Sequence, residues 1–239
     1  MSGHSKWHSI KHKKGLADAK KGAIFSKMSK NIAIAARGGA DPEMNFKLRM
    51  AIAAAKAANL PKDNIERAIA KGAGGGDGSQ IEEVVYEGLG PDNIPVIIKV
   101  LTDNKNRASQ SLKHLFTKFG GTLGAPVMWQ FDLKGVIHIS AEALAGKNYD
   151  ELEMQFIDLG VQDIKKSEAG LSLICDIENL QKVIMGLEKL GLTADSAEPE
   201  YVPKNPVKAT PEIINLIQSL LDALDEDEDV DNYYTNIEE

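Results

Sequence analysis

The sequence predicts an α+β multidomain protein: an N-terminal three-helix domain followed by two ferredoxin-like α/β domains, the third domain being inserted into the second. Three observations predict this class. Apolar residues recur at helical spacing up to Gly72, and the glycine-rich run GAGGGDG (residues 72–78) then interrupts the chain. Beyond it, short runs of β-branched residues alternate with helical patterns. With 239 residues and 43% hydrophobic content, the chain is long enough for several globular modules.

The N-terminal domain, residues 1–78, is predicted to hold three alanine-rich helices after a flexible arm. The first runs from about Asp18 to Arg37 and ends at a glycine pair. The second starts at an N-cap, Asp41, and reaches about Asn59, and the third covers 62–71. Helical geometry gives the first helix two arcs. The apolar arc holds Ile24, Phe25, Met28, Ile32, Ala35 and Ala36, and the adjoining basic ridge holds Lys20, Lys27, Lys30 and Arg37.

The third predicted domain, residues 135–204, follows a turn at Lys134-Gly135. Its elements are a strand (136–140), a helix (149–159), two strands (163–166 and 171–175), a helix (178–190) and a last extended stretch (193–201). This βαββαβ order is that of the ferredoxin-like split unit.

The second predicted domain, residues 79–134 with 205–239, is expected to be discontinuous. Strands at 84–87, 94–102 and 127–132 surround a helix at 105–119, which leaves this unit without a second helix and a partner strand. The tail supplies both, a helix at 211–224 and a strand near 233–237. In the strand at 127–132, Trp129 and Phe131 are expected on one face.

Charge divides the chain into two unlike parts. Residues 1–80 hold fifteen basic and six acidic side chains, whereas residues 81–239 hold thirteen basic and twenty-nine acidic ones. Folding does not require such a split. It is typical of a protein that binds a polyanion with one region and repels it with the rest.

The first fifteen residues favour nucleic acid as that polyanion. Lys6, Lys11, Lys13 and Lys14 suit phosphate contacts, and Trp7 among them suits stacking on a base or sugar. A solvated tail is the alternative, but disordered tails are poor in aromatic residues. DNA and ribosomal RNA both suit such an arm, because the sequence carries no base-reading signature.

Other classes of function are less well supported. No apolar run is long enough to span a membrane, and the N-terminus has no apolar signal-peptide segment. A single cysteine, Cys175, excludes an internal disulfide and a cysteine-based zinc site, so we expect a cytoplasmic protein. His4, His8 and His12 lack an acidic co-ligand, so no metal is expected. No catalytic constellation is visible, so we expect neither enzyme activity nor a cofactor or small-molecule substrate. His114 and His138 are interpreted as structural.

The acidic run at residues 225–231, DEDEDVD, is interpreted as a solvated loop. It starts like a calcium loop, but Val230 occupies the glycine position and Asn236 the bidentate acid position. The alternative is that this run competes with nucleic acid for the basic region.

Several blocks resemble the YebC family from end to end. They are GHSKWHSIKHKK (3–14), KNIAIAARGG (30–39), NLPKDNIERAIAKG (59–72), YEGLGP (86–91), TDNKNRA (102–108) and DVDNYYTN (229–236). The last block departs from the family pattern at Tyr233, where an aliphatic residue is more usual. The resemblance implies a cytoplasmic, non-enzymatic protein of three domains. Bacterial members are generally described as DNA-binding transcriptional regulators, and mitochondrial and some bacterial relatives as translation activators acting on the ribosome.

Together these observations predict a nucleic-acid-binding regulator of gene expression, most simply a DNA-binding transcriptional regulator. The alternative is a ribosome-associated translation activator that binds ribosomal RNA through the same basic region. The predicted contacts are Lys6, Trp7, Lys11, Lys13, Lys14, Lys20, Lys27, Lys30 and Arg37.

Overall fold

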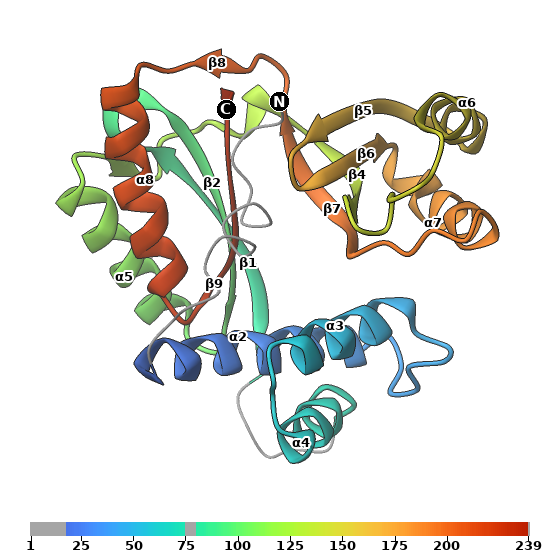
Figure 1. Ribbon diagram of the computed structural model, residues 1–239. Coiled ribbons are helices and arrows are strands. Elements are labelled where there is room, and N and C mark those ends of the chain that lie inside the picture. Colours follow the sequence, from blue (N-terminus) through green and yellow to red (C-terminus); the bar gives the residue numbers. More distant parts are fainter. Residues whose placement is uncertain (1–17, 75–79, 239) are drawn as a thin grey trace. The chain divides into compact units, whose positions relative to one another are not determined.

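The structure, a computed structural model, describes residues 18–74 and 80–238, with side chains described for 22–74 and 80–237 (Figure 1). These residues form two compact units. The first contains residues 18–127 and 209–233, and the second contains 128–208 and 234–238. The N-terminal helices therefore belong to the same compact unit as the first sheet. The boundaries of the three domains expected from the sequence stay a prediction.

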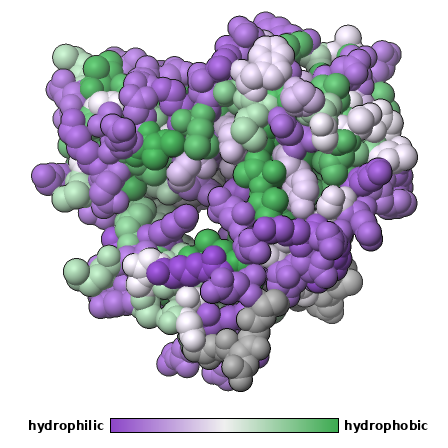
Figure 2. Space-filling model, turned by 180° about the vertical axis from the view of Figure 1, so that it is seen from behind, coloured by the Kyte–Doolittle hydropathy of each residue, from purple (hydrophilic) through white to green (hydrophobic). Residues whose placement is uncertain are grey.

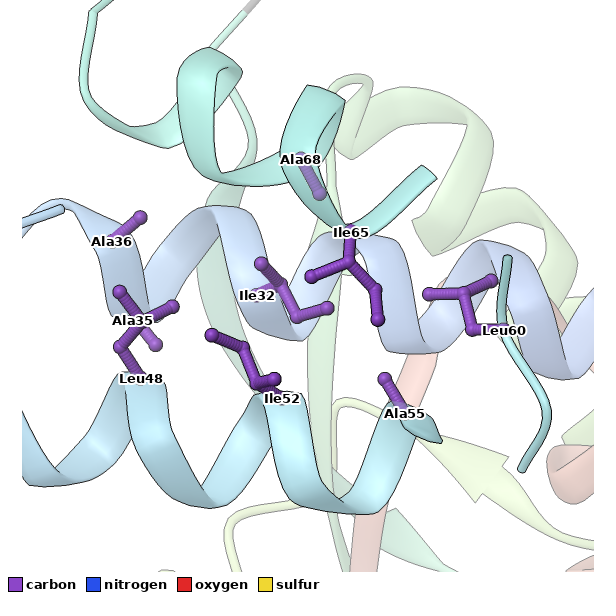
Figure 3. Packing of buried hydrophobic residues seen from close by; sticks show 9 residues of the cluster. All are labelled: Ile32, Ala35, Ala36, Leu48, Ile52, Ala55, Leu60, Ile65 and Ala68. Atoms are coloured by element: carbon purple, nitrogen blue, oxygen red, sulfur yellow. The ribbon is translucent and has the colours of Figure 1, made fainter. Parts of the chain in front are cut away.

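Three helices lie within residues 18–74, here called the N-terminal region: α2 (Asp18–Ala36), α3 (Phe46–Ala57) and α4 (Lys62–Gly72). Their shared core is small and rich in alanine, which lets the helices approach closely (Figure 3). It consists of Ile32, Ala35, Ala36, Leu48, Ile52, Ala55, Leu60, Ile65 and Ala68. The apolar arc predicted for α2 is thus confirmed in its C-terminal half, and Phe25 and Met28 pack against the same core.

Helix α3 starts four residues later than predicted. Its N-cap is Asn45, whose side chain accepts a hydrogen bond from the Leu48 amide at 3.0 Å and donates to the Ala35 carbonyl at 2.8 Å. Asp41 instead accepts from the Glu43 amide in a local turn. The core contains Leu48 and Ile52, whereas the alanine-rich side at 53–54 is exposed. The helix has apolar residues on two opposite sides, so its sequence pattern does not identify the buried side.

The first sheet contains β1 (Glu82–Leu89), β2 (Pro95–Thr102), β3 (Thr122–Leu123) and β9 (Val230–Thr235), in the order β3-β1-β2-β9. Figure 1 shows α5 (Lys105–Lys118) and α8 (Pro211–Glu226) side by side on one face of it. The C-terminal helix and strand therefore complete this sheet, as the element count predicts.

The predicted strand at 127–132 is wrong in its first half. Residues 128–130 form a 3₁₀ turn, and the third strand of the first sheet is β3. Trp129 is 71% exposed whereas Phe131 is 5% exposed, so the two rings do not share a face. Alternation of apolar residues suggested a strand here, but the chain passes from the first compact unit to the second at this point.

The second sheet contains β4 (Phe131–Ser140), β5 (Val161–Ser167), β6 (Gly170–Cys175) and β7 (Ser196–Pro203), in the antiparallel order β5-β6-β4-β7. With α6 (Tyr149–Leu159) and α7 (Leu180–Lys189), this confirms the βαββαβ order. A parallel pair, β8 (Val207–Lys208) and β10 (Ile237–Glu238), lies in the same compact unit.

The predicted turn at Lys134-Gly135 is also wrong, because β4 runs straight through it. Gly135 pairs with Cys175 on one side and with Pro199 on the other. A Cβ at this position would lie 3.1 Å from the Cys175 sulfur and 3.1 Å from the Leu180 side chain. The glycine therefore serves close packing within the sheet.

Close packing also explains Gly72, the last residue of α4. A Cβ there would lie 2.1 Å from the Ala33 carbonyl oxygen of α2, whereas a Cβ on Gly22 of α2 meets nothing within 4 Å. We expect Gly72→Ala to lower the free energy of unfolding by about 1–3 kcal/mol. Gly22→Ala, the matched control, should leave it equal or raise it by up to about 1 kcal/mol. Urea unfolding followed by circular dichroism measures both; equal effects would contradict the packing.

Cys175 lies fully buried in β6. Burial and the nearby Asp176 raise the pKa of its thiol, and Lys134 only partly opposes them. Because the thiolate is the reactive form, we expect native Cys175 to resist a disulfide reagent at mildly alkaline pH and to react at once after unfolding in guanidinium chloride. Rapid reaction of the native protein would contradict this burial.

Candidate nucleic-acid interface

The nine predicted contact residues fall into two groups. Lys6, Trp7, Lys11, Lys13 and Lys14 lie outside the described residues, and Lys20 lies in α2 with a side chain that is also outside the description. Lys27, Lys30 and Arg37, in contrast, have described partners. Lys20 shares α2 with Lys27 and Lys30, and the joint action of the nine residues stays a prediction.

The three described members contact their own protein. Lys27 is only 7% exposed, and its ammonium donates to the Asp225 carbonyl. Lys30 donates to the Glu228 carbonyl at 2.9 Å and to the Asp229 carboxylate at 2.5 Å. Arg37 donates to the Ile81 carbonyl. The basic ridge expected on α2 is therefore not a solvated surface at Lys27 and Lys30.

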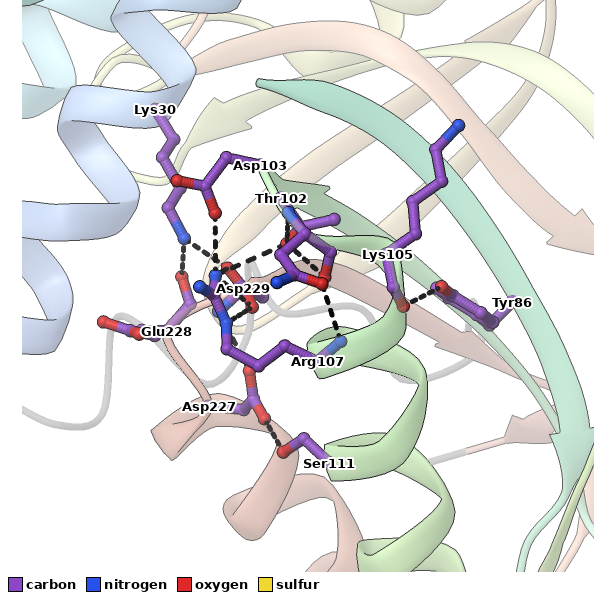
Figure 4. Close-up of polar contacts among 11 residues, drawn as sticks. Lys30, Tyr86, Thr102, Asp103, Lys105, Arg107, Ser111, Asp227, Glu228 and Asp229 are labelled. Atoms are coloured by element: carbon purple, nitrogen blue, oxygen red, sulfur yellow. Dashed lines mark hydrogen bonds and ion pairs between the residues drawn. The ribbon is translucent and has the colours of Figure 1, made fainter. Parts of the chain in front are cut away.

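Asp229 is the centre of the polar contacts around α2 (Figure 4). Asp229 is 4% exposed. Its carboxylate forms ion pairs with Lys30 of α2 and Arg107 of α5. Arg107 donates from Nε at 3.1 Å to Oδ2 and from Nη2 at 2.9 Å to both oxygens. The hydrogen bond that Arg107 donates to Asp229 raises the pKa of Arg107, against the opposing effect of burial.

The backbone of Asp229 is held as firmly as its side chain. Its amide donates to the Asp227 carboxylate at 2.9 Å, and its carbonyl accepts from the Leu101 amide of β2 at 2.8 Å. Asp227 in turn accepts from the Ser111 hydroxyl of α5. Asp229 therefore links α2, α5 and the first sheet.

Asp231, in β9, is also bound by side chains from α2 and β2. Its carboxylate accepts from Asn31 of α2 at 2.7 Å and lies 3.1 Å from the Lys99 ammonium of β2. We call residues 225–231 the acidic segment. Its interpretation as a solvated loop is wrong at Asp229, which is buried, and at Asp231, whose side chain is paired.

Exposed cations remain on the outer sides of the other two helices of the N-terminal region. α3 presents Lys47 and Lys56, and α4 presents Lys62, Arg67 and Lys71. Asp63 and Glu66 accompany them, and Lys62 lies 3.4 Å from Glu66. On the face seen in Figure 2, most of the surface is hydrophilic. These cations lie at the surface, in contrast to the buried Lys27 of α2.

His138, interpreted as structural, lies buried on the second sheet. Its Nδ1 is 2.9 Å from the Ser172 hydroxyl and its Nε2 is 2.8 Å from the Glu200 carboxylate. Within residues 18–74 and 80–238, no group of three side chains is arranged to hold a metal ion. No helix in that part of the chain is both long and apolar enough to cross a membrane.

Comparison with known proteins identifies the family. A family model described as "TACO1/YebC second and third domain" matches residues 81–237, and one described as "TACO1/YebC protein N-terminal domain" matches residues 5–75. The chain belongs to the TACO1/YebC family. The resemblance noted from the sequence blocks is thereby confirmed.

Relatives of this TACO1/YebC protein match it over nearly its whole length. A "Probable transcriptional regulatory protein" of Caldanaerobacter subterraneus is 46% identical over 241 residues, covering 100% of this chain and 98% of the relative. One from Thermotoga maritima is 45% identical over 241 residues, covering 100% and 94%. The crystal structure of a conserved hypothetical protein from Aquifex aeolicus matches with a TM-score of 0.83 at 41% identity, covering 96% of this chain and 95% of that one.

Two residues of the TACO1/YebC chain at this site were missed from the sequence, Arg107 and Asp229. A signal for Arg107 was present. It lies in the first turn of α5, where the helix macrodipole disfavours a cation, so an anionic partner was to be expected. No comparable signal marks Asp229, because it is one of six acids in seven residues.

The contacts of Asp229 predict a stability effect. We expect Asp229→Asn to lower the free energy of unfolding by about 2–4 kcal/mol. The loss lies below that of a fully buried pair because the Arg107 side chain is 48% exposed. Lys62→Ala, which breaks the exposed pair with Glu66, should cost less than about 1 kcal/mol. Urea titration measures both, and a small effect of Asp229→Asn would contradict the central position of its carboxylate.

Proposed function

We propose that this TACO1/YebC protein is a nucleic-acid-binding regulator of gene expression, and specifically a DNA-binding transcriptional regulator. The observation that carries the proposal is the charge asymmetry, a surplus of bases in residues 1–80 against a large surplus of acids beyond them. The names of its relatives, probable transcriptional regulatory proteins, support the regulatory role. The same names support a protein that is not an enzyme, and the composition supports a cytoplasmic location.

The proposed contacts are the nine residues predicted from the sequence, and the pairing of Lys27, Lys30 and Arg37 sets their order among the described ones. Lys6, Trp7, Lys11, Lys13, Lys14 and Lys20 make the first contacts, supported by the exposed cations of α3 and α4. Arg37 and Lys30 reach a phosphate only after leaving their partners, and the buried Lys27 requires the largest rearrangement. Phosphate contacts fix the position of the protein, and sequence preference then needs contacts to bases or to the shape of the duplex.

Salt dependence of binding tests this proposal. We expect the logarithm of the DNA association constant to fall linearly with the logarithm of salt concentration, by about 0.9 per neutralised phosphate. Lys11/Lys13/Lys14→Ala should therefore reduce the slope by about 2.7. A control triple variant of exposed lysines in the second compact unit, Lys147/Lys182/Lys189→Ala, changes the net charge equally and should leave the slope unchanged. Fluorescence anisotropy with labelled duplex measures all three proteins; equal slopes would contradict the proposed site.

Competition identifies the target. The protein is bound to labelled duplex at near-physiological salt, and genomic DNA or purified ribosomes are added at equal phosphate concentration. We expect DNA to displace the label at least as well as ribosomes do. Much better displacement by ribosomes would instead assign the basic region to ribosomal RNA and the protein to translation.

A further inference from the structure

We propose that Lys27, Lys30 and Arg107 form a second phosphate-binding site, which the acidic segment occupies in the free protein and a nucleic-acid phosphate occupies in the complex. This inference rests on the proposed function and adds a regulatory step to it. The acidic segment then acts as an intramolecular competitor of nucleic acid, with Asp229 as its central group.

The donors around Asp229 suit a phosphate as well as a carboxylate. Arg107 directs Nε and Nη2 at the two carboxylate oxygens, and the Lys30 ammonium lies against one of them. A forked guanidinium with an ammonium beside it is a common arrangement for binding phosphate oxygens. Asp229 thus supplies the anionic oxygens that a phosphodiester would supply.

Two further partners of these lysines are backbone carbonyls of the acidic segment. Lys27 donates to the Asp225 carbonyl, and Lys30 donates to the Glu228 carbonyl as well as to Asp229. A charged phosphate oxygen is a stronger acceptor than a carbonyl, so these contacts favour exchange when phosphate arrives. Replacing the acidic segment by phosphate keeps each cation hydrogen-bonded, and it avoids the cost of leaving a buried charge without a partner.

The position of the site on α2 connects it to the predicted arm. Lys27 and Lys30 are three residues apart on the helix, about 4.5 Å along its axis, and the helix continues toward the lysines at its N-terminal end. Nucleic acid bound by those lysines would be brought close to Lys27 and Lys30. Six acids in the acidic segment would repel that nucleic acid until the segment moves. Weak, non-specific binding is thereby disfavoured.

Amide hydrogen exchange of the parent protein tests, without any substitution, whether phosphate displaces the acidic segment. In the free protein the Asp229 amide is held by Asp227, and the Leu101 amide by the Asp229 carbonyl. We expect both amides to lose protection at least fivefold when saturating duplex DNA is added, and to regain it when high salt releases the DNA. Unchanged or increased protection at saturation would overturn the proposal.

A charge-removing variant tests the competition itself. If the acidic segment is closed in about 99 molecules of a hundred, Asp229→Asn should bind duplex about a hundredfold more tightly at moderate salt. Its salt slope should stay close to that of the parent, because the same cations meet phosphate in both complexes. Asp158→Asn on α6 is the matched control for net charge and should bind as the parent does.

The outcomes separate this inference from the function on which it rests. Equal affinity of Asp229→Asn and Asp158→Asn, with the parent still binding DNA, would overturn the competition and leave the proposed function intact. Absence of DNA binding by the parent protein would overturn both. Circular dichroism at the assay temperature shows whether Asp229→Asn is folded. If the variant is not folded, hydrogen exchange of the Asp229 and Leu101 amides in the parent protein tests the proposal.

Discussion

One buried carboxylate, that of Asp229, is the constraint on which the first compact unit depends. A carboxylate removed from water is strongly unfavourable unless cations and hydrogen bonds replace the lost hydration. Here Lys30 comes from α2, Arg107 comes from α5, and the Asp229 backbone is bound to Asp227 and β2. The carboxylate is satisfied only when these elements are in place together, so it couples the N-terminal helices to the first sheet.

This coupling matters because the N-terminal helices have little apolar surface of their own to bury. Their core contains four alanines among nine residues, and alanine contributes little area per side chain. Helix α2 gains a second apolar contact on its other side, where Ala33 and Ile34 pack against Ile81 and Leu101. The ion pair of Lys30 with Asp229 and the hydrogen bond of Asn31 to Asp231 lie along the same helix. A basic helix that would repel itself in isolation is thus stabilised by acids brought from the C-terminal part of the chain.

Local signals in the sequence predicted much of the fold. Both ends of α6 were predicted as observed, because Asn148 caps its start and Gly160 takes the left-handed conformation at its end. The predictions failed where local pattern was ambiguous. Helix α3 has apolar residues on two opposite sides, β4 runs through a glycine that packs closely, and Trp129 is exposed in what alternation suggested was a strand.

The sequence predicted the charge of the candidate site but not which of its residues form ion pairs with one another. Lysine density identified α2, and composition identified the acidic segment. The contact between them joins residues 198 to 200 positions apart in the sequence. No local signal distinguishes a solvent-exposed acidic run from one that forms ion pairs with a basic helix, because both can have the same composition.

The most direct test of the replacement of Asp229 by phosphate follows the Arg107 Nε–H resonance in a ¹H–¹⁵N spectrum while duplex DNA is added. In the free protein this proton is donated to Asp229. We expect its shift and its slow exchange with water to change in proportion to DNA bound, together with the Lys30 amide. An Arg107 resonance that stays constant while amides of the N-terminal region shift would contradict the exchange of Asp229 for phosphate.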